Sequence, residues 1–314
     1  MKSLTESMML FVAVVTAAAS CTKSEHPGEA SSAPVTVNFT ASELGTKTVF
    51  GEPETAGGKT SYPVLWTANQ KVALFYNYKN GVGEHVNVLP SSDNRSAEFS
   101  AEYIKDETAE SHIFCAVSPA SSVDWLDTEW REDHAPTLYA VIPASQTPMP
   151  GTCDEAAQIV VAKSVSETFP QKVLLEFTHL TAYGRIESLT LPKGAGEPEV
   201  IKLETNKKLA GTVDYMFDEG WSYYEKNTSS SIELRLDELK DKTKDIFFAC
   251  VPSLNEDTGE IEDWSDGSWL CLSVTTTDGI WRKTINFTSE HSLVFCAGQV
   301  SSFSITADGF EKQE

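Results

Sequence analysis

The residues with the clearest chemical potential lie in one acidic loop, "NEDTGEIEDWSDGS", at residues 255–268. Carboxylate oxygens bind Ca²⁺, and the indoles of Trp264 and Trp269 could stack on a sugar ring. The spacing does not match the EF-hand calcium loop. The alternative is an exposed acidic loop whose indoles cover the end of a β-sandwich. Ca²⁺ binding therefore stays open, and Trp264 and Trp269 are candidates for ligand stacking.

Signatures of catalysis are missing from the rest of the chain. The sequence contains no H-E-x-x-H, no G-x-S-x-G and no Walker loop. The six histidines are scattered, and none pairs with another at the spacing of metal ligands. His179, within "FTHLTAY", is expected to be structural rather than a general base. The sequence thus predicts no enzyme, no cofactor and no metal centre.

The charge balance excludes one class of partner. The 314 residues carry 46 acidic and 24 basic side chains, which gives a formal net charge of −22. Such a surface repels phosphate backbones, so we expect no nucleic-acid partner. The hydrophobic content of 40 % is that of a globular protein, and the length favours two domains.

The amino-terminal stretch has the pattern of an export signal. Residues 8–19 are uncharged and too few to span a bilayer. Lys2 precedes them, and a run of small residues leads into Cys21. A small-residue run that ends in Cys resembles a bacterial lipobox, in which the cysteine becomes the lipid-bearing amino terminus; the alternative is an ordinary secretory signal with an incidental Cys. We predict a lipoprotein signal at 1–20, lipid on Cys21 and a flexible tether at 21–34.

The other cysteines are read as small buried side chains. Four of them, Cys115, Cys250, Cys271 and Cys296, lie in apolar, strand-like runs. Only Cys153, in the loop-like "PGTCDEA", is expected to be exposed. An odd number without a C-x-x-C pair gives no complete disulfide framework.

Short alternating runs dominate the remainder and predict an all-β protein. In "VTVNF" Val35, Val37 and Phe39 share one face, and "SIELRL" (residues 231–236) alternates in the same way. A hairpin turn is expected at Asn80-Gly81. Helical patterns are confined to residues 236–244 and a short piece near Asp154. Strand candidates at this spacing favour an antiparallel sandwich or barrel.

Two similar segments of the sequence suggest two related domains in tandem. "HIFCAVSPASS" (residues 112–122) resembles "DIFFACVPSLN" (residues 245–255), and each is followed by a loop with two tryptophans. The first of these loops carries Trp125 and Trp130, a second candidate pair for a glycan. We place one domain at 35–190 and the other at 191–314.

Collinear motifs resemble the fimbrillin-like family, the type V pilins of Bacteroidales and their relatives. They are "VNFTA", then "KT" at Lys47-Thr48, and the strand from Trp66 to Phe75. "AEFSAEY", "YAVIPASQTP", "LLEFTHLTAYGRIESLTLP" and "FCAGQVSSFSI" follow in the family's order. The resemblance covers nearly the whole chain after the tether. It implies two transthyretin-like β-sandwich domains, export as a lipoprotein and a role in surface fimbriae.

The resemblance also implies strand exchange between subunits, with one departure in this chain. In polymerising members a protease cuts after an arginine beyond the first strand, and the vacated groove accepts a strand from another subunit. Val35, Val37 and Phe39 match that strand, but no arginine precedes Arg95. Only Lys47 and Lys59 could serve a trypsin-like protease in the loop that follows.

The predicted function is therefore a structural or adhesive subunit of type V-like fimbriae, more an anchor or accessory subunit than a cleaved stalk pilin. Its implied partners are other fimbrial subunits through donor-strand pairing, the outer membrane through the lipid, and a host protein or glycan. The alternative is a surface glycan-binding lipoprotein that uses the tryptophan loops.

Overall fold

The computed structural model describes residues 33–42, 54–56, 59–61, 65–127, 136–218, 220–222, 228–255 and 260–314. The chain divides into two units, Met1–Ala33 and Pro34–Glu314. The fold described here is that of the second unit. Its described residues form strands and two short 3₁₀ turns, η1 (Ala120–Ser122) and η2 (Glu155–Ala157), so the protein is all-β as predicted.

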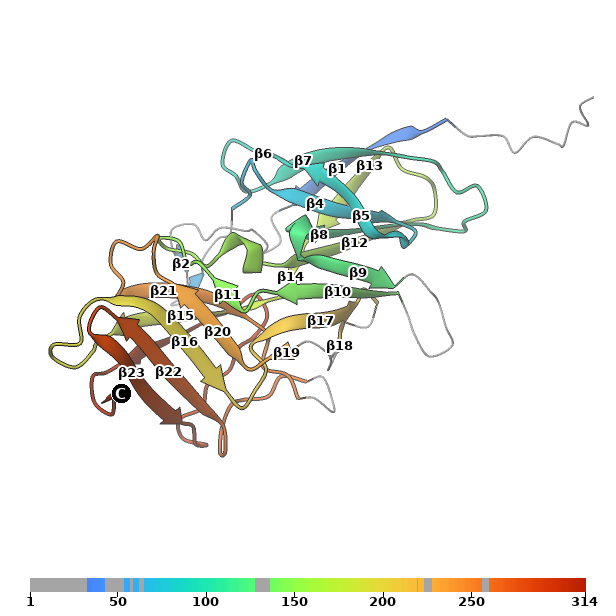
Figure 1. The fold of residues 1–314 in the computed structure, drawn as a ribbon. Coiled ribbons are helices and arrows are strands. Elements are labelled where there is room, and N and C mark those ends of the chain that lie inside the picture. The colour runs from blue at the N-terminus through green and yellow to red at the C-terminus, as the bar shows by residue number, and fades with distance from the viewer. Residues whose placement is uncertain are drawn as a thin grey trace, which may run out of the picture. The chain divides into compact units, whose positions relative to one another are not determined.

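A β-sandwich surrounds the first strand, β1 (Val35–Ser42). One of its sheets has the strand order β13-β1-β7-β6, and the other has the order β14-β12-β8-β4-β5 (Figure 1). The partners of β1 in the first sheet are β13 (Lys172–Glu176), β7 (Ala97–Tyr103) and β6 (Leu89–Pro90). The second sheet consists of β14 (Thr178–His179), β12 (Val160–Ser166), β8 (His112–Ser118), β4 (Lys71–Tyr76) and β5 (Lys79–Asn87).

The remaining strands form a second group of sheets. The largest has the order β11-β20-β16-β22-β23-β25 and lies with a three-stranded sheet, β21-β15-β24, around shared buried side chains. Their bounds are β11 (Ser145–Gln146), β20 (Ser231–Arg235), β16 (Pro198–Thr205), β22 (Trp269–Thr276), β23 (Gly279–Asn286), β25 (Glu311–Lys312), β21 (Lys244–Cys250), β15 (Ala182–Leu189) and β24 (Val300–Ile305). A further sheet has the order β18-β17-β10-β9, with β19 paired to β17, and β2 pairs with β3. Their bounds are β18 (Gly220–Ser222), β17 (Ala210–Met216), β10 (Thr137–Ile142), β9 (Val123–Asp127), β19 (Thr228–Ser229), β2 (Glu54–Ala56) and β3 (Lys59–Ser61).

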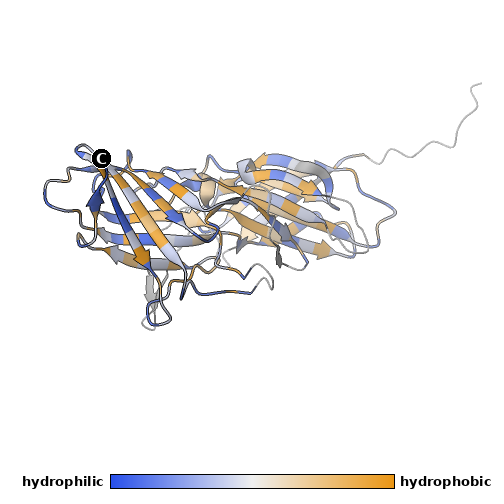
Figure 2. Cartoon of the chain, turned by 60° about the horizontal axis from the view of Figure 1, so that its bottom comes forward, coloured by the Kyte–Doolittle hydropathy of each residue, from blue (hydrophilic) through white to orange (hydrophobic). Residues whose placement is uncertain are grey.

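Two large hydrophobic cores follow from the alternation of side chains along these strands. Strand β4 shows how they are separated, because Val72 and Leu74 face the first core while Ala73 and Phe75 face the second. A strand that is covered on both faces needs a continuous apolar run, and "VALFY" supplies one. Figure 2 shows the alternation of hydrophilic and hydrophobic residues along many of the strands.

Strand pairing crosses the predicted domain boundary at residue 190. Strand β10, from the first half of the chain, pairs along its whole length with β17 from the second. Strand β15, which ends at the boundary, pairs with β21 and β24. The sheets therefore mark no division at residue 190, and the domains 35–190 and 191–314 stay a prediction.

Two local predictions are wrong. Residues 236–243 form turns and bends rather than a helix, and Lys244 begins β21. In the second turn Asp241 Oδ1 accepts from Thr243 N at 3.0 Å. The hairpin expected at Asn80-Gly81 turns instead at Asn77 and Tyr78, both of which have positive φ. Asn77 is suited to that conformation, and its Oδ1 accepts from Ile113 N at 2.8 Å. The short helical piece near Asp154 is present as η2.

No helix among the described residues is long and apolar enough to cross a membrane.

Candidate functional site

The first strand has the side-chain alternation that its sequence predicts. Val37, Phe39 and Ala41 are buried, with at most 1 % of each exposed, whereas Thr36, Asn38 and Thr40 face solvent. Val35, at the start of the strand, is half-buried. The apolar face of β1 is therefore a row of inward side chains that ends in a small one.

Hydrogen-bonded neighbours flank β1 on both sides. Strand β7 pairs with it antiparallel from Val35↔Tyr103 to Ala41↔Ala97. Strand β13 pairs with it in parallel from Asn38↔Lys172 to Ser42↔Glu176. The pairing with β13 begins where Asn38 N donates to Gln171 O at 3.0 Å. Strand β1 is thus a central strand although it is the first of the described strands.

An aromatic pocket holds Phe39. Its ring stacks on Phe99 of β7, with centroids 5.5 Å apart and planes 12° from parallel. The rings of Phe114 and Tyr103 meet it edge to face at 5.6 and 6.3 Å. Burial, followed by the nearby charge of Glu84, raises the pKa of Tyr103, so its phenol stays neutral. Aromatic pairs of this geometry add to the free energy of simple area burial.

A groove would remain if β1 left the sheet. Its walls would be the edge of β7, which pairs with β1 from Val35 to Ala41, and the edge of β13, which pairs with it from Asn38 to Ser42. Its floor would be the sites now filled by Val37, Phe39 and Ala41. Such a groove can accept another strand, because main-chain hydrogen bonds supply affinity and side-chain sites supply specificity. Sequence reasoning found Val37 and Phe39 but missed Phe99, Tyr103 and Phe114, although the alternation of "AEFSAEY" could have indicated Phe99.

The predicted processing residues lie only partly within the described chain. Cys21 and Lys47 lie outside the described residues. Lys59 is the first residue of β3, and its Cα partner in β2 is Ala56. The backbone after Lys59 is therefore engaged in a hairpin, which is a poorer protease substrate than an open loop.

The tryptophans of the acidic loop are placed differently from each other. Trp264 has only 2 % of its surface exposed, and its indole packs against Phe295 and Phe287 with centroids 5.1 and 6.2 Å apart. It therefore offers no open face to a sugar. Trp269, the first residue of β22, is half-buried, and its backbone N–H donates to Asn206 Oδ1 at 3.3 Å. Of this pair only Trp269 remains a candidate for ligand stacking.

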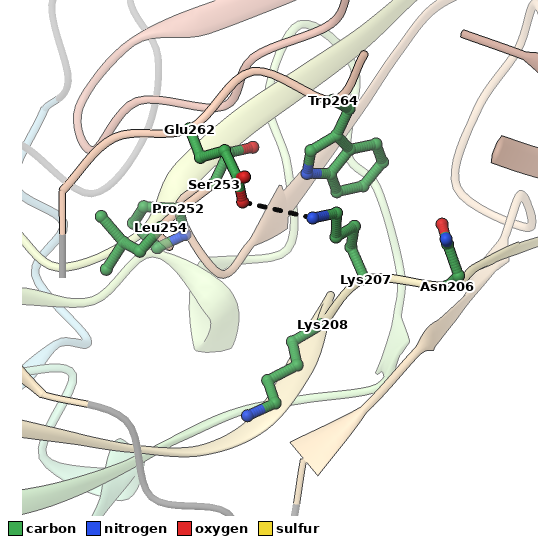
Figure 3. A pocket seen from close by; sticks show the side chains of 8 residues that line it. All are labelled: Asn206, Lys207, Lys208, Pro252, Ser253, Leu254, Glu262 and Trp264. Atoms are coloured by element: carbon green, nitrogen blue, oxygen red, sulfur yellow. Dashed lines mark hydrogen bonds and ion pairs between the residues drawn. The ribbon is translucent and has the colours of Figure 1, made fainter. Parts of the chain in front are cut away.

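A pocket of about 290 Å³ lies beside Trp264 (Figure 3). Its lining consists of Asn206, Lys207, Lys208, Pro252, Ser253, Leu254, Glu262 and Trp264. Its polar groups already have protein partners: Lys207 Nζ lies 3.2 Å from Glu262 Oε2, and Ser253 Oγ accepts from Phe295 N at 3.0 Å. Satisfied groups of this kind favour a structural role over ligand binding.

The carboxylates of the acidic loop are spread over separate partners. Glu262 pairs with Lys207, while Asp266 accepts from Ser289 N at 3.1 Å. Among the described residues no group of three or more His, Cys, Asp or Glu side chains is placed to hold a metal ion. Residues 256–259 of the loop lie outside the described chain, so Ca²⁺ binding there stays untested.

Burial of the cysteines follows the prediction for three of the five described ones. Cys115, Cys250 and Cys271 are buried, and Cys296 is half-buried. Cys153, expected to be exposed, is fully buried. The chain around it enters the η2 turn, which directs the thiol into a small core with Tyr183 and Phe247. Burial raises the pKa of this thiol well above its usual value, so it is not a reactive thiolate.

The other residues singled out in the sequence are the tryptophan pair for a glycan, Trp125 and Trp130, and the histidine expected to be structural, His179. Trp125 on β9 is 50 % exposed, and its predicted partner Trp130 lies outside the described residues. His179 Nδ1 shares a 2.8 Å hydrogen bond with Tyr183 Oη, in keeping with the structural role expected of it.

No protein-family model matches the chain, and no curated protein matches its sequence. Several solved structures do match. A candidate cell adhesion protein from Bacteroides ovatus is 10 % identical with a TM-score of 0.47, over 90 % of this chain and 96 % of that one. A fimbrial assembly protein from Parabacteroides distasonis is 12 % identical with a TM-score of 0.38, over 89 % and 94 % of the two chains. Their descriptions agree with the family that the sequence resembles, but likenesses at this level establish no function for the chain.

Proposed function

We propose that this protein is a structural subunit of cell-surface fimbriae, held to the outer membrane by lipid on Cys21 and joined to other subunits by exchange of β1. The observation that carries the proposal is the setting of β1. It is the first strand of the fold, and yet it is central in its sheet and buries Val37, Phe39 and Ala41. Its partner strands, β7 and β13, belong to later parts of the chain and would stay in place if β1 left. An equivalent strand from another subunit could then make the same main-chain and side-chain contacts.

The anchor role is favoured over that of a cleaved stalk subunit. No arginine lies between Cys21 and Arg95, so an arginine-specific protease cannot release β1. Lys59 lies in the β2–β3 hairpin, which leaves Lys47 as the better site for a lysine-specific protease. Intact mass and amino-terminal sequencing of the protein from native membranes tests this role. A diacylated or triacylated Cys21 with no later cut is expected; an unlipidated chain that begins beyond β1 would overturn the anchor.

Strand exchange is tested by opening the connection after β1. A site for a sequence-specific protease placed within residues 43–49 and then cut would leave β1 bound without a covalent link. A fluorescent peptide of residues 34–42 should enter the groove and displace the resident strand, as anisotropy would report. The Phe39→Ala peptide is the matched control, because it keeps the backbone and loses the aromatic anchor. Failure of the unaltered peptide to enter under any condition that keeps the protein folded would refute exchange.

Glycan binding is the second candidate, supported by the half-exposed indole of Trp125 and the partly exposed Trp269. A glycan array that gives signals abolished by Trp125→Ala or Trp269→Ala would favour it. Trp264→Ala is not a valid probe, since its buried indole supports the core.

A further inference from the structure

The residue pattern of β1 recurs near the carboxyl end of the chain. Residues 36–41 read T-V-N-F-T-A, and residues 284–289 read T-I-N-F-T-S. Four of the six positions are identical. The other two differ by one methylene, Val to Ile, and by one hydroxyl, Ala to Ser. In an extended strand Ile285, Phe287 and Ser289 would share one face, as Val37, Phe39 and Ala41 do.

The recurring segment occupies a much less buried position. Residues 284–286 are the last three residues of β23, and residues 287–289 follow the end of that strand at Asn286. Ile285 and Phe287 are half-buried, and Ser289 is exposed. Strand β22 covers one edge through the pairs Cys271↔Thr284 and Leu270↔Ile285. Strand β25 reaches β23 only at Trp281 and Arg282, so no described strand pairs with the other edge at residues 284–286.

We propose that residues 284–289 of a second copy of this chain are the strand that fills the groove of β1. The inference rests on the proposed strand exchange and names its donor. In the groove the donor would run as β1 does, antiparallel to β7 and parallel to β13. Phe287 would take the place of Phe39 between Phe99, Tyr103 and Phe114.

Burial of the inward side chains favours the transfer. Ile285 and Phe287 are half-buried where they stand, whereas the sites of Val37 and Phe39 are closed to solvent. Moving both side chains into the groove removes further apolar surface from water, which is favourable in proportion to its area. The segment gives up its pairing with β22 at residues 284–286, the bonds from Phe287 N to Ser268 O and from Ser289 N to Asp266 Oδ1, and the contact of Phe287 with Trp264 at 6.2 Å. In the groove it would pair with β7 and β13 on both edges, and Phe287 would gain three aromatic neighbours.

The groove also restricts the register and the size of its occupant. Ala41 is fully buried at this end of the groove, so a larger side chain there would have to displace its packed neighbours. A shift of two residues would place the phenylalanine at one of the smaller sites, and a shift of one would turn every side chain to the wrong face. Ser289 is small enough, although its buried hydroxyl makes it a weaker occupant than alanine. The chain's own β1 should therefore bind more tightly than the donor.

The consequence for assembly is a head-to-tail contact. Groove and donor are different surfaces of one chain, so each copy can offer one and use the other. A heterologous contact of this kind extends into a filament or ring rather than closing as a two-fold dimer. The resident β1 must leave the groove first, and because no cut after β1 is proposed it must do so while still joined to the chain, which makes this opening the controlling step.

A peptide competition on the full chain tests the donor. The chain is cut within residues 43–49 as above and loaded with a fluorescent peptide of residues 34–42. Three unlabelled peptides then compete for the groove: residues 34–42, residues 283–290, and residues 283–290 with Phe287→Ala. We expect displacement by the first two in that order of strength. The alanine variant should be weaker by about tenfold or more, as truncation of a buried aromatic anchor is.

The outcomes separate this inference from the proposed function. If the unlabelled peptide of residues 34–42 competes and that of residues 283–290 does not, strand exchange stands and the named donor is wrong. Equal competition by the Phe287→Ala peptide would also refute the donor, because binding would not use the aromatic pocket. If no peptide competes, both proposals fail.

Discussion

Strand β1 and residues 284–289 carry nearly the same residues in two different settings. In β1 the pattern has a strand on each side and inward side chains that are closed to solvent. In residues 284–289 it has β22 on one side, and its side chains are half-buried or exposed. The residue pattern determines which side chains share a face, whereas position in the sheet determines how much those side chains contribute to stability.

The comparison separates two properties that a donor strand requires. The groove must hold its occupant firmly, and this is the setting of β1. A donor must instead be able to leave its own site, and residues 284–286 are paired on one edge alone, by β22, while Phe287 N and Ser289 N each donate one bond, to Ser268 O and Asp266 Oδ1. One pattern can serve both purposes only because the two positions differ in burial.

The largest expected difference is between the two phenylalanines. Phe39→Ala removes a fully buried ring and should lower the free energy of unfolding by about 3–5 kcal/mol. Phe287→Ala removes a half-buried ring and should cost about 1–2 kcal/mol. Urea unfolding of both variants, followed by tryptophan fluorescence, gives the two values. Equal losses would mean that the settings do not differ in energy as their burial indicates.

A second comparison concerns the small residues at the ends of the two patterns. Ala41→Leu overfills the site opposite Ala97 and should cost about 1–3 kcal/mol. Ser289→Leu lies at an exposed position and should change stability by no more than about 0.5 kcal/mol. Thermal unfolding of the two variants measures this contrast. A tolerated Ala41→Leu would show that the groove does not select small side chains.

The smallest expected effect is electrostatic and is confined to the surroundings of β1. Burial, and then the charge of Glu102, raises the pKa of Glu84. Glu102 is the Cα partner of Thr36 in β1. Because the folded pKa is the higher one, the folded state loses stability as the pH rises through it and regains that stability on acidification.

Glu84→Gln should therefore raise the free energy of unfolding at pH 7, by no more than about 0.5 kcal/mol for so exposed a group. The gain should vanish below about pH 4, where the unfolded glutamate is also protonated. Urea unfolding of Glu84→Gln and the unaltered chain at pH 7 and pH 3.5 measures it. A gain that persists at pH 3.5 would show that it is not electrostatic.

Short-range patterns predicted much of the fold. Alternation placed Val37 and Phe39 inside, and the apolar run "VALFY" matches a strand that is buried on both faces. The burial of Trp264 and Cys153 could not be read in the same way. Both lie in polar segments, and they are buried by residues distant in sequence, Phe295 over Trp264 and Tyr183 over Cys153.

The candidate site, too, could be predicted from the sequence only in part. The inward residues of β1 follow from local alternation, but the pocket around Phe39 depends on which strands become neighbours. Phe99 and Phe114 come from different sheets and meet only in the sandwich. The pairing of β10 with β17 is likewise a tertiary event, which no pattern within either half of the chain indicated.

The central claim is that β1 leaves its groove and a strand of another copy replaces it. A reversible disulfide tests this most directly. Asn38→Cys and Ser100→Cys introduce cysteines at directly opposite positions, where Asn38 faces solvent, and oxidation should tie β1 to β7. Lys202→Cys with Glu233→Cys, an opposite pair on β16 and β20, is the control. Assembly is followed by native mass spectrometry of mixed light and heavy-isotope chains.

We expect the oxidised Asn38→Cys/Ser100→Cys protein to form no mixed assemblies and to regain them on reduction, while the control pair assembles in both states. Mixed assemblies that form equally well with β1 locked would contradict the account.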